Sequence, residues 1–223
     1  MTRSTAAASA DLRAVDGRRP GRRGRATREK LLATLDGLLE STGYRELKVV
    51  DVARAAGTSP ATFYQYFADV EQAILVLGEG IMTDATALAG HVGEEWDDAG
   101  RVAERIVTEF MDFWEAHRSV LRVIDLATEE GDLRFQALRT RALNAITAAL
   151  ADVIGSRQRV VRAPTALDPM ATAGVLVAML AHVSSHRYGF ESWGIRTAEL
   201  NKSLTRILHL GVTGASPTAS RTS

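Results

Sequence analysis

Apolar residues recur at helical spacing along most of this 223-residue chain. Between residues 27 and 43 the leucines recur every three to four positions, which predicts a helix with one wide apolar stripe. Similar stripes predict helices over residues 69–88, 102–117, 120–128, 132–154 and 197–210. No strand-like alternation is found, so the chain is predicted to be all-α with about nine helices.

Two further segments complete the second half of this pattern. The segment 168–183 is apolar on nearly every side, so a helix there should be covered all round, with Asp168 as its cap. Residues 156–167 contain three arginines and Pro164, and we expect a loop. Residues 213–223 are expected to be a disordered tail.

The helix predicted over 69–88 has a polar start and two glycines inside it. Asp69 and Gln72 stand in the capping-box arrangement that fixes a helix N-terminus. Gly78 and Gly80 each cost about 1 kcal/mol of helix stability relative to alanine. They either permit close packing against a neighbour or leave this helix pliable.

The segment 49–67, VVDVARAAGTSPATFYQYF, departs from the pattern of long helices. Small apolar residues at 52, 53 and 56 give a short helix one buried face, and Gly57 then stops it because glycine tolerates positive φ. Ser59 is a good N-cap and Pro60 is favoured at the first helical position, so a second helix of about two turns begins there. The spacing predicts two short helices around a three-residue turn, which is a helix-turn-helix.

The second short helix can bury only one of its sides. Phe63 and Phe67 lie four positions apart and are expected to face inward. The remaining large side chains must then point largely outward: Thr62, Tyr64, Gln65 and Tyr66. Hydroxyls, an amide and aromatic rings exposed in this way favour a helix that reads bases in a DNA major groove. The alternative, in which the two tyrosines are core aromatics, conflicts with the single buried side.

Charge is unevenly distributed although the net charge is zero. Residues 1–30 hold nine Lys or Arg and three acids, a net +6, which leaves 18 basic and 24 acidic residues, a net −6, for the rest. Residues 1–25 are predicted to be a flexible basic arm, whose Arg22, Arg23 and Arg25 track phosphates or enter a minor groove. A merely solubilising tail is the alternative.

Composition also indicates which kinds of site to expect. The chain has no cysteine, no uninterrupted apolar run of membrane-spanning length and no secretory h-region, so a cytoplasmic protein without a membrane partner is expected. An Arg/Ser/Ala-rich transit peptide is the alternative for the first 25 residues, and Asp11 and Asp16 count against it. No catalytic motif is present, so we expect neither an enzyme nor a cofactor. No metal site is expected either, although His182 and His186 have a spacing that permits one.

Residues 28–81, including TREKLLATLDGLLESTGYRELKVV and the helix-turn-helix after it, resemble TetR-type bacterial transcriptional regulators. The resemblance implies a DNA-binding domain at 26–68 and an effector-binding and dimerisation domain at 69–212. It implies a homodimer paired through helices at about 168–189 and 197–211. It further implies that the dimer binds a near-palindromic operator in double-stranded DNA and that a small-molecule effector changes the separation of its reading helices.

The resemblance also places the DNA contacts on Thr62, Tyr64, Gln65 and Tyr66. Further candidates for phosphate contact are Thr58, Ser59, Lys48, Arg45 and Arg54, of which Ser59 already has a role as a cap. Two positions depart from the family pattern: Val49 stands where Ser or Thr is usual, and Val70 where Lys is usual. The DNA grip is therefore expected to come from elsewhere, above all from the basic arm.

The body offers candidate ligand-binding residues of two kinds. Apolar and aromatic candidates are Phe110, Phe113, Trp114, Met179 and Val183, although such residues at helical spacing are commonly core. Polar residues in apolar surroundings are Asp125, Asn144 and His182, although the last also suits a dimer interface. These residues suggest a mostly apolar effector, and together with the resemblance they lead us to expect a repressor that such an effector releases. The alternatives are an activator, a nucleoid-coating protein without effector, and a helical enzyme with a vestigial head.

Overall fold

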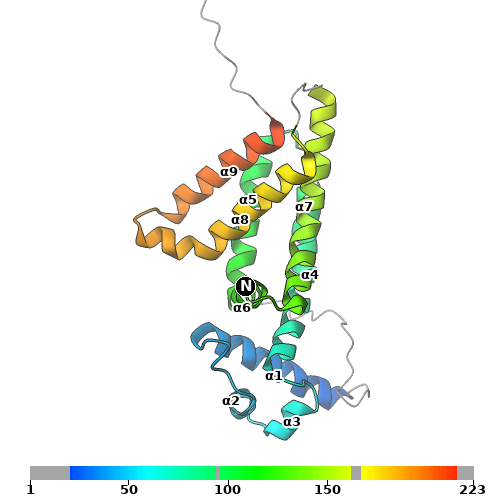
Figure 1. Cartoon of the computed structure of the whole chain (residues 1–223), viewed down its shortest axis with the longest axis vertical. Coiled ribbons are helices and arrows are strands. Elements are labelled where there is room, and N and C mark those ends of the chain that lie inside the picture. Colours follow the sequence, from blue (N-terminus) through cyan, green and yellow to red (C-terminus); the bar gives the residue numbers. More distant parts are fainter. Residues whose placement is uncertain (1–20, 94–95, 162–166, 215–223) are drawn as a thin grey trace, which may run out of the picture. The chain divides into compact units, whose positions relative to one another are not determined.

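The computed structural model describes residues 21–93, 96–161 and 167–214, and every regular element within these ranges is an α-helix (Figure 1). The helices are α1 (Arg22–Ser41), α2 (Val49–Ala55), α3 (Pro60–Tyr64), α4 (Val70–Val92), α5 (Ala99–Ala116), α6 (Arg118–Glu129), α7 (Leu133–Val161), α8 (Pro169–Ser192) and α9 (Thr197–Thr213). The predicted all-α fold is confirmed. The predicted tail falls almost wholly outside the described residues.

The chain forms two compact units. Unit 1 comprises the residues up to Thr83 together with His117–Thr140, and unit 2 comprises Asp84–Ala116 together with the residues from Arg141 onward. Unit 1 thus contains the predicted helix-turn-helix domain, the first half of α4, all of α6 and the start of α7. The surface that presents α3 is therefore built together with α6.

Unit 1 is organised around the apolar stripe of α1. Leu31 and Leu35 are 1% and 0% exposed, and α1 packs against both α2 and α6. Ser119 at the start of α6 donates a hydrogen bond of 2.5 Å to the Asp36 carboxylate of α1. The predicted leucine stripe is therefore the element that joins the helix-turn-helix to α6.

Helix α1 begins earlier than the leucine stripe does. The Arg25 N–H donates to the Gly21 carbonyl at 3.0 Å, so the first turn starts at Arg22 rather than at Thr27. Arg22, Arg23 and Arg25 consequently lie on a helix, and the prediction of a flexible arm is wrong for them. Arginine and alanine are good helix formers, so the helix extends through a segment without an apolar stripe. The rest of the predicted arm, residues 1–20, lies outside the described residues.

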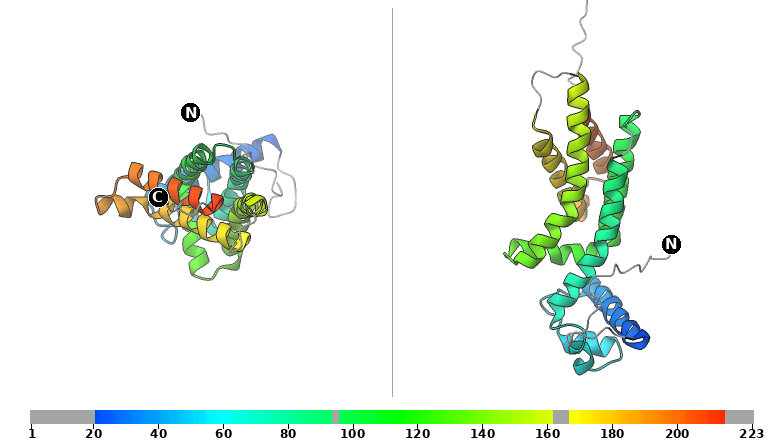
Figure 2. Two further views of the ribbon diagram at one scale, coloured as in Figure 1. Left: turned by 90° about the horizontal axis from the view of Figure 1, so that it is seen from above. Right: turned by 90° about the vertical axis from the view of Figure 1, so that its right-hand side faces the viewer.

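In unit 2, α5 packs against α8 and α9 (Figure 2). The α5 side chains Ile106, Val107 and Phe110 are at most 1% exposed. A Cβ atom built on Gly211 of α9 would lie 2.9 Å from both methyl carbons of Leu176 of α8, so glycine there permits the two helices to approach closely. These three helices form one part of the core of unit 2, to which α7 adds the buried Ile146, Leu150 and Ile154.

Two predicted boundaries in unit 2 are wrong. Helix α7 continues to Val161, so the expected loop from 156 is helical over its first six residues, and 162–166 lie outside the described residues. Helix α8 continues to Ser192, and Gly194, whose φ is +81°, follows its C-cap Trp193. The Asp168 cap is confirmed, since its carboxylate accepts the Ala171 N–H at 2.7 Å.

Helix α8 is also not covered all round in the single chain. Val175 is 70% exposed and Met170 is 51% exposed. The apolar residues on nearly every side of α8 led to the expectation of full coverage, but within one chain the helix packs only on α5 and α9 among the strongly contacting helices. An apolar face of α8 therefore remains open.

Helix α4 corrects the expectation that nothing here has membrane-spanning length. Among the described residues it is the one helix long and apolar enough, by length and composition, to cross a membrane. The buried core helix of a soluble protein passes the same test, and α4 buries Ile74, Ile81, Ala85 and Leu88 within the protein. The helix gains its apolar character from alanines and glycines interspersed with larger residues, which a search for uninterrupted apolar runs misses.

Candidate nucleic-acid interface

The turn between α2 and α3 is set by Gly57. Its φ is +66°, its N–H donates to the Arg54 carbonyl at 3.0 Å, and the Thr58 N–H donates to the Ala53 carbonyl at 2.9 Å. This pair of bonds is a Schellman motif, which satisfies the last carbonyls of α2 and ends the helix. The predicted helix stop is confirmed, although four residues rather than three separate α2 from α3.

Ser59 restarts the helix as predicted. Its hydroxyl accepts the Thr62 N–H at 3.2 Å and lies 3.0 Å from the Thr62 hydroxyl, and Pro60 occupies the first turn. Helix α3 ends at Tyr64, so it is shorter than the predicted two turns. Beyond it the Phe67 N–H still donates to the Phe63 carbonyl at 3.0 Å, which keeps the two phenylalanines on one side.

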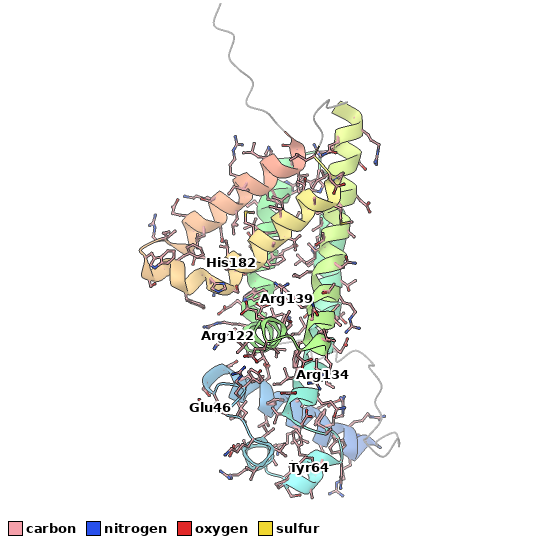
Figure 3. All side chains as sticks on the ribbon, viewed as in Figure 1. Glu46, Tyr64, Arg122, Arg134, Arg139 and His182 are labelled. Carbon is pink, nitrogen blue, oxygen red and sulfur yellow. The ribbon has the colours of Figure 1, made fainter. Side chains whose placement is uncertain are left out.

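The inner side of α3 is anchored by these two rings. Phe63 and Phe67 are 0% and 1% exposed, and their ring centroids lie 5.4 Å apart. The Arg28 guanidinium lies 5.3 Å from the centroid of Phe67, and burial lowers the pKa of Arg28. With its phenylalanines fixed in the core, α3 directs Tyr64 outward, where this side chain is 52% exposed at the lower edge of Figure 3.

The structure brings the predicted base-contacting residues to one short stretch of unit 1. Tyr64 and Gln65 are exposed, whereas Thr62 and Tyr66 are half-buried. Of the remaining candidates, Ser59, Lys48 and Arg54 are exposed and Thr58 is half-buried. Their contact with DNA stays a prediction.

Two caps and one core position shape the start of α4. Asp69 accepts the Gln72 N–H at 2.7 Å, and the Gln72 side chain accepts the Ala68 N–H at 2.5 Å, so the capping arrangement is confirmed. Val70 is only 9% exposed. Val70 therefore contributes to the core and supplies no cation for a phosphate at this position.

A groove of about 870 Å³ runs beside α3 between the starts of α2 and α4. Its charged lining residues are Arg45, Lys48, Asp69, Glu71 and Glu130. Three carboxylates thus face two cations, so the groove carries an excess of negative charge. This flank of the reading helix is unfavourable for a phosphate.

The carboxylate of Glu130 comes from the turn between α6 and α7, which we call the α6–α7 corner (residues 129–134). Glu130 forms an ion pair with Arg45 and accepts a hydrogen bond of 3.1 Å from the Tyr44 hydroxyl. Gly131, with a φ of +88°, reverses the chain immediately afterwards. The corner therefore already occupies Arg45, one of the predicted phosphate-contacting residues.

A second ion pair ties the same corner to α4. Arg134 lies 2.7 Å from Glu71 and also 2.7 Å from Asp132. Its hydrogen bond to Asp132 lowers the pKa of that carboxyl to about 2. The two ion pairs of Arg134 lie at the protein surface, so each contributes at most about 1 kcal/mol to stability.

Sequence patterns did not reveal the position of Lys30. A Cβ atom built on Gly57 would lie 3.6 Å from the Lys30 ammonium nitrogen, so this exposed lysine of α1 reaches the turn before α3. Lys30 stands seven positions after Arg23 on the helix, which indicates a shared face. Nothing in the sequence, however, indicates that this face lies beside the turn.

The predicted ligand-binding residues are distributed over both units. In unit 2, Phe110 and Trp114 are buried, Phe113, Met179 and Val183 are half-buried, and Asn144 and His182 are exposed in the single chain. Asp125 belongs to unit 1, where it accepts a hydrogen bond of 2.8 Å from Arg139. Their contact with a ligand stays a prediction.

Comparison with known proteins identifies the family. Residues 31–72 match the family model described as bacterial regulatory proteins, tetR family. Residues 84–219 match the model described as the tetracyclin repressor-like C-terminal domain, which covers more than half of the chain. The chain belongs to the TetR family. The resemblance drawn from residues 28–81 is confirmed, and this TetR-family chain is a DNA-binding transcriptional regulator.

Individual relatives agree with this assignment. The HTH-type transcriptional regulator EthR of Mycobacterium tuberculosis is 30% identical over 121 residues, which are 53% of this chain and 56% of EthR. The match thus spans little more than half the length of that curated relative.

Solved structures share the fold of this chain. The fatty acid degradation regulator FadR of Bacillus halodurans has a TM-score of 0.65 at 16% identity, over 86% of this chain and 97% of FadR. FadR of Bacillus subtilis in complex with stearoyl-CoA has a TM-score of 0.63 at 14% identity, over 84% and 99%.

Proposed function

We propose that this TetR-family regulator is a cytoplasmic repressor that binds a near-palindromic operator as a homodimer. A small, mostly apolar effector releases it. The observation that carries the proposal is the arrangement of α3 and the three residues after it, where Phe63 and Phe67 are buried in the core while Tyr64 and Gln65 face solvent. Side chains exposed on a helix of this kind serve base recognition in a major groove.

The open apolar face of unit 2 supports the homodimer. Large apolar residues of α8 and α9 remain exposed in the single chain, namely Met170, Val175, Ile207 and Leu210. Large apolar residues left exposed on two neighbouring helices favour an association interface. Pairing around a two-fold axis would present two copies of α3 to two half-sites, which is the reason to expect a near-palindromic operator.

The aromatic residues of α5 support an apolar effector. Phe110, Phe113 and Trp114 lie on one helix, with the ring centroids of the two phenylalanines 6.4 Å apart. The Bacillus subtilis FadR structure, which has the same fold, holds stearoyl-CoA. Release follows from reciprocal coupling, because an effector that prefers the DNA-free state weakens DNA binding by the same factor by which DNA weakens effector binding.

Tyr64→Ala tests the proposal. An operator is first selected from random duplexes with the wild-type protein, and dissociation constants are then measured for the operator and for a scrambled duplex at one salt concentration. We expect the substitution to weaken operator binding by about 10- to 100-fold, since a good base contact is worth about 1–3 kcal/mol. Binding to the scrambled duplex should change little. Tyr64→Phe, which keeps the ring, serves as the matched variant, and thermal unfolding checks that both variants fold.

The same titration tests the nucleoid-coating alternative. A regulator should prefer its operator over scrambled DNA by about 10³ or more. Equal affinities of the wild-type protein for both duplexes would refute the proposed operator recognition, whatever the effect of Tyr64→Ala.

A further inference from the structure

We propose that Lys30 is the phosphate contact that sets the register of α3 on DNA, and that the α1 flank of the head thereby replaces the flank beside α4 as the backbone anchor. The proposal rests on the DNA binding proposed above. It concerns a residue of α1 outside the helix-turn-helix itself. The ligand is a backbone phosphate of the operator duplex.

The position of Lys30 is the first observation. Its ammonium lies beside Gly57, where the chain turns from α2 into α3, and the left-handed conformation of Gly57 fixes that turn. A phosphate bound by Lys30 would therefore lie at a defined distance from Ser59 and the first turn of α3. A cation at this point determines where α3 meets the bases as well as how strongly it binds.

The charges around Lys30 are the second observation. The exposed residues of 22–30 include four cations and one acid, Glu29, a net charge of +3, because Arg28 is buried. Arg23 stands on the same face of α1, two helical turns before Lys30. Figure 1 shows the N-terminal end of α1, in dark blue, toward the same end of unit 1 as α3. The α1 flank is thus a continuous source of positive charge next to the reading helix.

The opposite flank supplies the third observation. The groove beside α4 carries an excess of carboxylates, and its Arg45 is paired with Glu130. A duplex held by α3 must place its phosphates against both flanks. Lys48 is the one groove cation without a carboxylate partner among the described ion pairs, so the α4 flank offers DNA one unpaired cation against the four exposed cations of the α1 flank.

The chain is well suited to a direct test because it has three lysines, Lys30, Lys48 and Lys202. Each is exposed, and they lie on α1, before α2 and on α9. Each lysine is replaced by glutamine in the full-length protein, and the affinity for the selected operator is measured across a range of NaCl concentrations. Lys30→Arg keeps the charge and serves as the rescue variant.

Loss of one phosphate contact should reduce the slope of log affinity against log salt concentration by about 0.9. It should also weaken operator binding about fivefold at 0.15 M salt. We expect this change for Lys30→Gln, little change for Lys30→Arg and none for Lys202→Gln. Acetylation of the complex with an amine-reactive reagent, followed by mass spectrometry, should show Lys30 protected by operator DNA and Lys202 unprotected. Selection of a new operator by Lys30→Gln should also yield a less sharply defined site.

Two outcomes separate this inference from the proposed function. If wild-type protein prefers its operator and Tyr64→Ala abolishes that preference, the proposed function stands. An unchanged salt slope for Lys30→Gln, together with equal acetylation of Lys30 with and without DNA, would then overturn the role of Lys30 alone. A larger loss for Lys48→Gln than for Lys30→Gln would place the anchor on the α4 flank and would equally overturn it.

Discussion

The two flanks of the helix-turn-helix differ in charge and in what holds them. On the α1 flank, Arg22, Arg23, Arg25 and Lys30 are exposed on one straight helix. On the α4 flank, the α6–α7 corner contributes Glu130 to a groove that already contains Asp69 and Glu71. One flank is open and basic, whereas the other is acidic and tied to the corner by ion pairs.

The two flanks therefore differ in role: the α1 flank gives a constant attraction for DNA, whereas the attraction of the α4 flank depends on the α6–α7 corner. The α1 flank attracts DNA whatever the state of the rest of the protein. On the α4 flank, Glu130 pairs with Arg45, so a DNA phosphate would have to compete with the protein's own carboxylate for that cation. A movement of the corner therefore changes the charge offered to DNA on one side only.

The largest effect that tests this comparison should come from the basic flank. Replacing Arg22, Arg23 and Arg25 together by glutamine should reduce the salt slope of operator binding by about 2.7 and weaken binding about a hundredfold at 0.15 M salt, since each lost phosphate contact accounts for about 0.9 of the slope. Gel-shift titrations across salt concentrations measure both quantities. The matched control replaces three exposed arginines elsewhere, Arg101, Arg122 and Arg159, and should leave the slope unchanged. Equal losses in the two triple variants would remove the distinction between the flanks.

The next effect concerns the packing of α4 against Ile124 of α6 and Leu138 of α7, the two helices that flank the corner. A Cβ atom on Gly78 would overlap the Leu138 side chain and lie 3.2 Å from Ile124, whereas one on Gly80 would meet nothing within 4 Å. Both substitutions gain the same helix propensity, so the difference between their free energies of unfolding isolates the cost of overpacking. We expect Gly78→Ala to be less stable than Gly80→Ala by about 1–3 kcal/mol. Urea unfolding of the two variants measures it. Equal stabilities would show that the Leu138 and Ile124 side chains yield easily and that the α4 flank is not firmly held.

The smallest effect should come from the corner's carboxylate. Glu130→Gln removes one negative charge from the groove and releases Arg45. Operator affinity should rise by about two- to fivefold, in keeping with a solvated pair worth less than about 1 kcal/mol, and the salt slope should steepen. Glu129→Gln, one residue earlier, removes the same charge outside the groove lining and is the matched control. A similar gain in both variants would point to overall charge rather than to competition for Arg45.

Gly78 and Gly80 of α4 have different surroundings, and this difference depends on tertiary packing. The pattern of α4 left close packing and pliability as alternatives for both positions. Gly78 turns out to be a close-packing position facing Leu138 and Ile124, whereas Gly80 has open space around it. The partners lie some 45 to 60 residues away in the chain, so no local pattern distinguishes the two glycines.

The helix-turn-helix itself was predictable because its determinants are local. Positive φ at Gly57, the Ser59 cap and the inward phenylalanines each follow from residues within a few positions of one another. The start of α1 was misjudged because a helix rich in arginine needs no apolar stripe to continue. Lys30 beside Gly57 and Glu130 beside Arg45 depend on tertiary packing, which a single sequence does not reveal.

The exposed apolar residues of α8 and α9 have a consequence for how operator occupancy depends on the concentration of this regulator. If two copies must associate through Val175 and Ile207 before either can grip both halves of a site, then occupancy at low copy number grows with the square of the monomer concentration. Halving the monomer concentration would then lower the number of occupied sites by roughly three quarters. Dilution of the protein during cell growth would therefore strongly change the expression of the regulated genes.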